Sequence, residues 1–107
     1  MPRKRAQPQP AALNGGRAHT PNQVVAYNLA RARVLRGWTQ DEAAAALEPW
    51  LGVRWSRATF SQAERSVAGK LIRNFTADEI VAFARTFRLP VEWFFSSAPR
   101  ATEKSKF

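Results

Sequence analysis

The side chains best suited to a chemical role lie in residues 56–65, which form one short polar segment. Ser56 is a favourable N-cap, so the segment is predicted to be a helix. At 100° per residue, one arc of this helix holds Phe60, Ala63 and Glu64, with Thr59 at its edge. The opposite arc is polar and basic, and it holds Arg57, Ala58, Ser61, Gln62 and Arg65.

This outer arc has the composition of a surface that reads DNA. Arginine and glutamine form the paired hydrogen bonds that distinguish guanine and adenine edges in the major groove. A connection containing Gly52 joins this helix to the one before it, which makes the pair a helix-turn-helix candidate. Many helices with Arg and Gln on the outside are simply solvated, so the segment alone leaves both interpretations open.

Capping boxes predict where three other helices begin. In each box a threonine precedes glutamine or glutamate by three residues, as in Thr20 and Gln23, Thr39 and Glu42, and Thr76 and Glu79. The first helix is expected to run to about Arg36 and to stop at Gly37. Trp38 should then pack into the core between the first two helices.

The second helix is expected to end or kink at Glu48-Pro49, because proline lacks the amide hydrogen that a helix interior needs. The segment that follows, residues 49–55, is too apolar for a solvent loop. We expect an extra helical turn there in which Trp50 and Leu51 are buried. Trp55 is expected in the core, with a place beside a nucleic-acid backbone as the alternative.

The last part of the folded region is strongly amphipathic. Ile80, Phe83, Ala84 and Phe87 share one stripe of a helix that Leu89-Pro90 ends. Residues 91–95 predict a short aromatic helix, buried in the core or against a partner. The pattern as a whole therefore predicts an all-α domain of five helices over residues 21–97.

The net charge of +9 is concentrated at the chain ends. Residues 1–21 carry +4, residues 22–98 carry +3 and residues 99–107 carry +2. This balance favours a polyanionic partner. Residues 1–20 are predicted to be a disordered basic arm, in which Arg3, Lys4 and Arg5 contact phosphates or stay solvated. Residues 98–107 are predicted to be a polar basic tail.

Several classes of function lack the residues they need. The chain has no cysteine, and its only histidine, His19, lies in the polar N-terminal segment. No inward pair of carboxylates suggests acid–base catalysis. We therefore expect no enzyme activity, no metal and no cofactor. No apolar run forms a signal peptide or a membrane span, so a cytoplasmic, nucleoid-associated protein without a membrane partner is expected.

With the helices placed, the chain resembles the Cro and phage-repressor class of helix-turn-helix proteins, also called the xenobiotic-response-element family. The resemblance covers about residues 22–95. Three segments carry it, in the family's order: Arg33-x-x-Arg36-Gly37-Trp38-Thr39-Gln40, residues 60–65 and residues 91–95. It implies a compact, five-helix, lambda-repressor-like DNA-binding domain.

The resemblance also implies roles for single residues. Arg33 and Glu64 match a family pair that forms a salt bridge between helices 1 and 3. Arg57, Ala58 and Gln62 align with the family's base-contacting positions, with Thr59 or Ser61 near phosphate. Ser61 and Arg65 share the outward arc and are expected to contact bases as well. Phosphate contacts would come from Gln40, Thr59, Lys70, Arg73 and the arm residues Arg3, Lys4 and Arg5.

The chain departs from the family pattern between Gln40 and Phe60, where it is longer than the usual motif. The excess lies around residues 48–55, and Gly52 is the nearest counterpart of the family's turn glycine. This extended turn leaves the choice between Arg57 and Ala58 open at the start of the recognition helix.

The leading hypothesis is a sequence-specific DNA-binding transcriptional regulator, with double-stranded DNA as its partner. Family members usually bind as dimers, and Trp93-Phe94-Phe95 is either the dimer surface or part of the monomer's own core. The alternative is a protein-interaction module, like an antitoxin or adaptor, that uses residues 49–55 to hold a regulatory protein.

Overall fold

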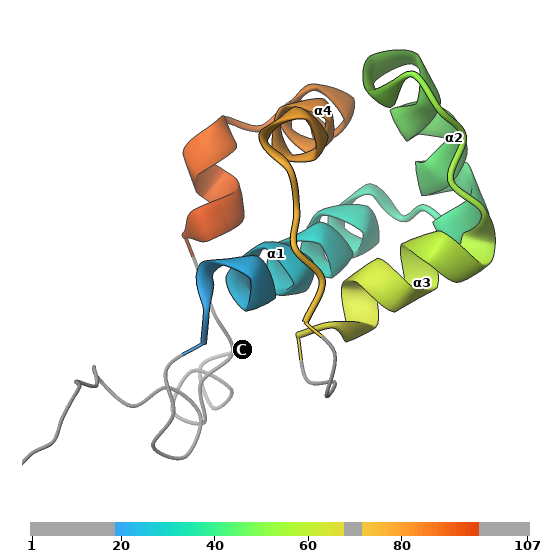
Figure 1. Cartoon of the computed structure of the whole chain (residues 1–107). Helices are drawn as coiled ribbons and strands as arrows, with labels where there is room; N and C mark the ends of the chain where they lie inside the picture. The colour runs from blue at the N-terminus through green and yellow to red at the C-terminus, as the bar shows by residue number, and fades with distance from the viewer. Residues whose placement is uncertain (1–18, 68–71, 97–107) are drawn as a thin grey trace, which may run out of the picture.

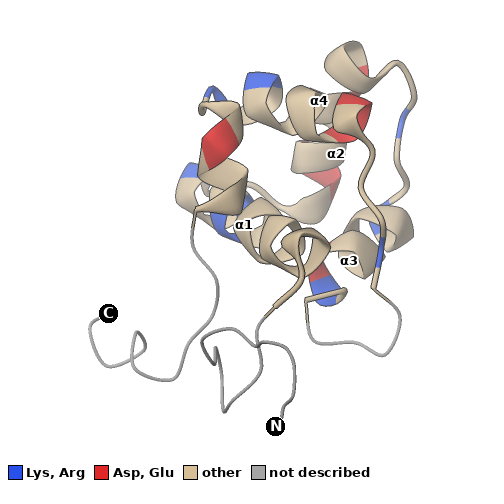
Figure 2. Ribbon diagram, turned by 60° about the vertical axis from the view of Figure 1, so that its left-hand side comes forward, with Lys and Arg blue, Asp and Glu red and all other residues tan. Residues whose placement is uncertain are grey.

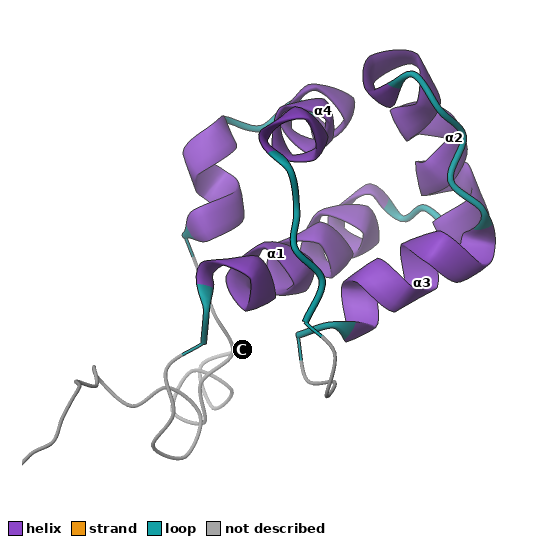
Figure 3. Cartoon of the chain, in the orientation of Figure 1, coloured by secondary structure: helices purple, strands orange, loops and turns teal. Residues whose placement is uncertain are grey.

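The computed structural model describes residues 19–67 and 72–96 of the 107-residue chain. Lys70, the tail 98–107 and all of the basic arm except His19 and Thr20 lie outside the described residues. The elements in the described part are α1 (Pro21–Arg36), α2 (Gln40–Leu51), α3 (Arg57–Arg65), α4 (Ala77–Phe87) and the 3-10 helix η1 (Val91–Phe95). Figures 1 and 3 show their arrangement, in which the described residues contain no strand.

The all-α prediction is confirmed, but the fifth helix is not an α-helix. Residues Val91–Phe95 form a 3-10 turn, in which Trp93 N donates to the Pro90 carbonyl at 3.0 Å. Ser96 N in turn donates to the Trp93 carbonyl at 3.1 Å. The segment follows a proline and is only five residues long. Short helical segments of this length commonly use the tighter i to i+3 hydrogen bonds of a 3-10 helix.

All three predicted capping boxes are present, with both reciprocal hydrogen bonds formed in each. The first helix ends as predicted at Gly37, whose φ of 71° lies in the left-handed region. Glycine adopts this conformation without the steric cost that other residues incur. The helix boundaries that depend on local backbone chemistry are therefore those that the sequence predicts well.

Of the two predicted alternatives at Glu48-Pro49, an end or a kink, the end is wrong, because α2 continues through Pro49 to Leu51. Residues 50 and 51 are helical, as the predicted extra turn requires. Proline removes one backbone hydrogen bond, the one to the Ala45 carbonyl, and Ala45 lies on the exposed side of the helix. The helix ends one turn later at Gly52, whose φ is 90°. Leu51 packs against the core, whereas Trp50 is 52% exposed, so the predicted burial of Trp50 is also wrong.

An aromatic cluster lies at the centre of the core. Phe60, Phe83 and Phe94 are fully buried, and Trp55 is 8% exposed. The Trp55 ring meets Phe60 and Phe83 edge to face, with centroids 6.0 and 5.9 Å apart. Edge-to-face pairs stabilise an aromatic core beyond simple area burial. Trp55 therefore belongs to the core, as expected, and it holds the start of α3 against α4.

The helices enclose this core from several sides (Figure 1). α3 packs against α1 and α2, while α4 packs against α2 and η1 packs against α1. Trp38, in the α1–α2 connection, is half-buried and stacks on Phe87 of α4 at 5.5 Å, rather than lying only between the first two helices. None of the helices in residues 19–67 and 72–96 is long and apolar enough to cross a bilayer.

Two adjacent residues of η1 provide a test of this core. Phe94 is fully buried, whereas Phe95 is 46% exposed. Phe94→Ala should lower the free energy of unfolding by about 3–5 kcal/mol through cavity formation. Phe95→Ala should lower it by about 1 kcal/mol. Urea titration followed by circular dichroism would measure both, and equal losses would contradict this placement of η1.

Candidate nucleic-acid interface

Helix α3 separates into a buried face and an exposed face. Phe60 and Ala63 are 0% exposed and Glu64 is 9% exposed, so these three side chains fix the helix to the domain. The opposite face carries the predicted base-contacting residues, of which four are exposed and Ser61 is half-buried: Arg57, Ala58, Ser61, Gln62 and Arg65. No other segment of residues 19–67 and 72–96 covers this face.

Local hydrogen bonds organise the polar residues of α3. Thr59 N donates to the Ser56 hydroxyl at 3.0 Å, which caps the helix start, and Ser56 donates to the Thr59 hydroxyl at 3.0 Å. One turn further on, Arg65 Nη1 donates to Ser61 Oγ at 2.6 Å. Arg57, by contrast, forms no hydrogen bond or ion pair within the described residues. Arg65 is thus held along the face, while Arg57 is free to extend toward a ligand.

The charges are distributed unequally around the domain. Of the seven acidic residues in the described part, three lie on α2, two on α4 and one on η1. Figure 2 shows these acidic positions on α2, α4 and the last helix. The seventh is Glu64, the only acid on α3, and it points inward. The outward face of α3 therefore carries positive charge without an opposing carboxylate on the same helix, as an anionic partner requires.

A hydrogen-bonded network on Glu64 joins three helices. Arg33 of α1 donates through Nε to Glu64 Oε2 at 2.6 Å and through Nη2 to Oε1 at 3.1 Å. Gln40 of α2 donates through Nε2 to the same Oε1 at 3.0 Å. Arg33 Nη1 also donates to the Trp38 carbonyl at 2.9 Å. The Arg33–Glu64 ion pair that the family resemblance implies is therefore present, and it is bidentate.

This network keeps Arg33 charged. The pKa of Arg33 is raised, first by its hydrogen bonding with Glu64 and also by the charge of that carboxylate, against the opposing effect of partial burial. A group whose pKa is raised by folding contributes stability that is complete below its unfolded pKa. That contribution is lost only as pH rises through the higher folded pKa. For a guanidinium this window is strongly alkaline, so the pair persists throughout the neutral range.

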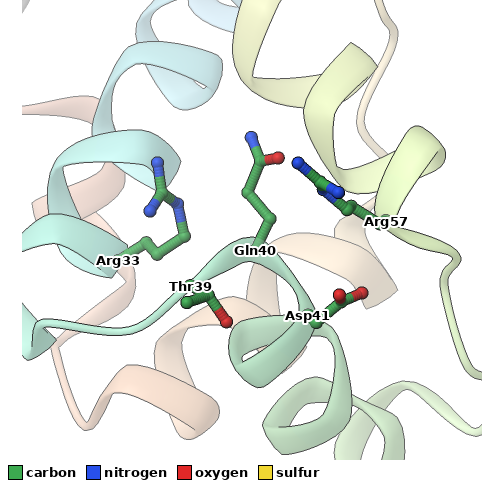
Figure 4. Close-up of a pocket in the computed structure, with 5 residues that line it drawn as sticks. All are labelled: Arg33, Thr39, Gln40, Asp41 and Arg57. Atoms are coloured by element: carbon green, nitrogen blue, oxygen red, sulfur yellow. The ribbon is translucent and has the colours of Figure 1, made fainter.

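Beside the network, a concavity of about 530 Å³ opens between the start of α2 and the start of α3, lined by Arg33, Thr39, Gln40, Asp41 and Arg57. Figure 4 shows Gln40 projecting between the side chains of Arg33 and Arg57. The Gln40 amide has a second N–H besides the one used on Glu64. The concavity thus offers an amide donor and an unpaired guanidinium, which suit a phosphate oxygen. The Asp41 carboxylate lines the same concavity, on the Arg57 side of Gln40 (Figure 4), and opposes an anion there.

Arg73, predicted to contact phosphate, has partners within the fold. Its Nη2 donates to Glu79 Oε2 at 3.1 Å, and its guanidinium lies 4.8 Å from the Trp55 ring centre. Arg73 therefore anchors the segment after α3 to the core, and its predicted phosphate contact stays a prediction. The sequence gives no direct signal for the roles of Thr39 and Asp41 in lining the concavity, because only the tertiary placement of α2 beside α3 brings them there.

Comparison with known proteins gives a likeness in fold. The chain is similar to the crystal structure of the hypothetical transcription factor NHTF from Neisseria, with a TM-score of 0.53 and 24% sequence identity. The match covers 91% of this chain and 93% of that chain. No protein-family model and no curated protein match the chain. The likeness establishes a shared fold.

The contribution of the network to stability can be measured by making the same Glu→Gln change at two positions. Glu64→Gln removes the charge that compensates the partly buried Arg33, and should lower the free energy of unfolding by about 2–3 kcal/mol. Glu48→Gln is the matched control, because the Glu48–Arg54 pair spans 3.5 Å and both side chains are about half-exposed. Its cost should stay below about 0.5 kcal/mol. Urea denaturation curves showing equal costs would contradict a structural role for Glu64.

Proposed function

We propose that this protein is a sequence-specific DNA-binding transcriptional regulator that places α3 in the major groove. The observation that carries the proposal is the division of α3, whose apolar and acidic residues face inward while Arg57, Gln62 and Arg65 face outward. An α-helix fits the major groove, and Arg and Gln side chains read base edges there. The fold shared with a protein described as a transcription factor agrees with this role.

Base contacts are assigned to the outward face of α3, including Ala58 and Ser61. Phosphate contacts are assigned to Gln40 and Thr59, which lie beside this face at the starts of α2 and α3. The proposal extends them to Lys70 and to the arm residues Arg3, Lys4 and Arg5, which lie outside the described residues. Phosphate contacts fix the position of the protein on the duplex, whereas base contacts select the sequence. The proposed role is DNA binding without enzyme activity. The proposed location is the nucleoid, in the cytoplasm.

A second copy is the proposed protein partner on DNA. Phe94 is fully buried and closes the monomer's own core, but its neighbours Val91 and Phe95 are 41% and 46% exposed. Arg31 of α1 lies 4.7 Å from the Trp93 ring centre. Leu35, one turn beyond Arg31, is 69% exposed. This apolar surface across α1 and η1 suits a symmetric contact, and a dimer would bind half-sites separated by one helical turn of DNA.

Selection of bound duplexes from random DNA at near-physiological salt tests the proposal. The wild-type chain should enrich one site. Gln62→Ala should weaken binding to that site by about 1–3 kcal/mol and relax the preference at one base pair. Lys70→Ala should weaken binding to all sequences alike, because a phosphate contact carries no sequence information.

Arg88→Ala provides the control, because Arg88 is exposed at the end of α4 and outside the α3 face. It should leave both the selected sequence and its affinity nearly unchanged. Enrichment of no site by the wild-type chain would contradict the regulator function. An unchanged site preference in Gln62→Ala would instead contradict the assignment of Gln62 alone.

A further inference from the structure

A second concave surface lies at the other end of α2. A groove of about 370 Å³ separates this end from α4, and its lining residues are Trp50, Leu51, Asp78, Val81, Ala82 and Arg85. Figure 1 shows the far end of α2 beside α4, while α3 lies toward the opposite end of α2. Trp50 follows Gln40 by ten residues, which corresponds to about 15 Å along the helix axis. The groove is therefore distinct from the candidate DNA surface.

The groove exposes apolar side chains that the core does not use. Of its lining residues, Trp50 is 52% exposed and Val81 is 39% exposed. The guanidinium of Arg85 lies 5.7 Å from the Trp50 ring centre, so these two lining side chains are in contact across the groove. Exposed apolar side chains next to charged ones are found at sites that bind another protein.

Two unpaired and opposite charges border this apolar surface. Asp78, in the first turn of α4, forms no ion pair within the described residues, because Arg73 pairs with the adjacent Glu79 instead. Arg85, in the last turn, likewise forms no ion pair there. The two residues are seven positions apart, which places them two turns and about 10 Å apart along α4. The end of the groove near the start of α4 is therefore negative, and the end near the last turn of α4 is positive.

This arrangement selects one kind of occupant over the others. One carboxylate and one guanidinium give the groove no net positive charge, so a nucleic acid is disfavoured. A symmetric contact with a second copy would place this hollow against the same hollow, and two hollows do not fill one another. Residues 1–18 and 97–107 contain no stripe of large apolar residues at helical spacing, so the chain's own ends are poor candidates.

We propose that this groove docks a short amphipathic helix of another protein. Its apolar stripe would lie against the exposed side chains of Trp50 and Val81, as in other helix-in-groove complexes. A basic side chain of the partner would face Asp78, and an acidic one seven residues away would face Arg85. The proposal is independent of DNA binding. Because the groove and the α3 face are separate, the protein would hold a duplex and this partner helix at the same time.

A displayed library of helical peptides tests the proposal with the full-length chain. Each peptide carries a fixed apolar stripe, and its flanking positions are random. The enriched peptides should carry one basic and one acidic residue seven positions apart, in a single order. The double variant Asp78→Lys/Arg85→Glu should prefer the reverse order, with a shift in relative affinity of about tenfold or more.

Two further variants separate the groove from the rest of the domain. Val81→Glu should abolish peptide binding while retaining the helical circular dichroism spectrum and the binding of duplex DNA. Arg88→Ala lies outside the groove, the α3 face and η1, and it should leave both peptide binding and DNA binding unchanged. The proposal is overturned if no enriched peptide depends on Val81, or if the double reversal at Asp78 and Arg85 leaves the preferred charge order unchanged.

Discussion

The arrangement of the candidate DNA surface depends on one carboxylate, that of Glu64. It accepts hydrogen bonds from Arg33 of α1 and Gln40 of α2, so three helices meet at one buried point. Helix α3 has only nine residues, and an isolated helix of that length is not stable in water. Burial of Phe60 and Ala63 holds α3 on the domain, and the directional bonds to Glu64 fix how it is rotated. That rotation determines which residues of α3 face solvent.

Helix α2 links two surfaces of opposite character. At its start, Gln40 connects the Glu64 network to a polar concavity that contains the unpaired Arg57. At its end, the turn after Pro49 places Trp50 beside α4, next to Asp78 and Arg85. The length of α2 keeps these surfaces apart, so the polar concavity suits a polyanion and the groove suits the proposed amphipathic helix. Of the last two residues of α2, only Leu51 packs against the core. The proposed docking groove gives a role to the other one, Trp50.

The sequence predicted features that depend on neighbouring residues, and missed features that depend on distant ones. The three capping boxes and Gly37 act within one helical turn, and the inward side of α3 follows from helical periodicity. Pro49 did not end α2, because the one carbonyl that it leaves without a helical hydrogen bond, that of Ala45, lies on the exposed side of the helix. The exposure of Trp50 depends on how α4 packs against α2. The conformation of η1 depends on how it packs against α1 and α4. Arg73 and Glu79 are only six residues apart, but neither a capping pattern nor helical periodicity indicates that they pair.

The central claim, that the outward face of α3 contacts DNA, is tested most directly by an amide chemical-shift map. The ¹⁵N-labelled chain would be titrated with the duplex that it selects. The largest shifts are expected in Arg57–Arg65 and at Gln40, with little change in α4 and η1. Shifts confined to the groove between α2 and α4, with α3 unperturbed, would contradict the claim.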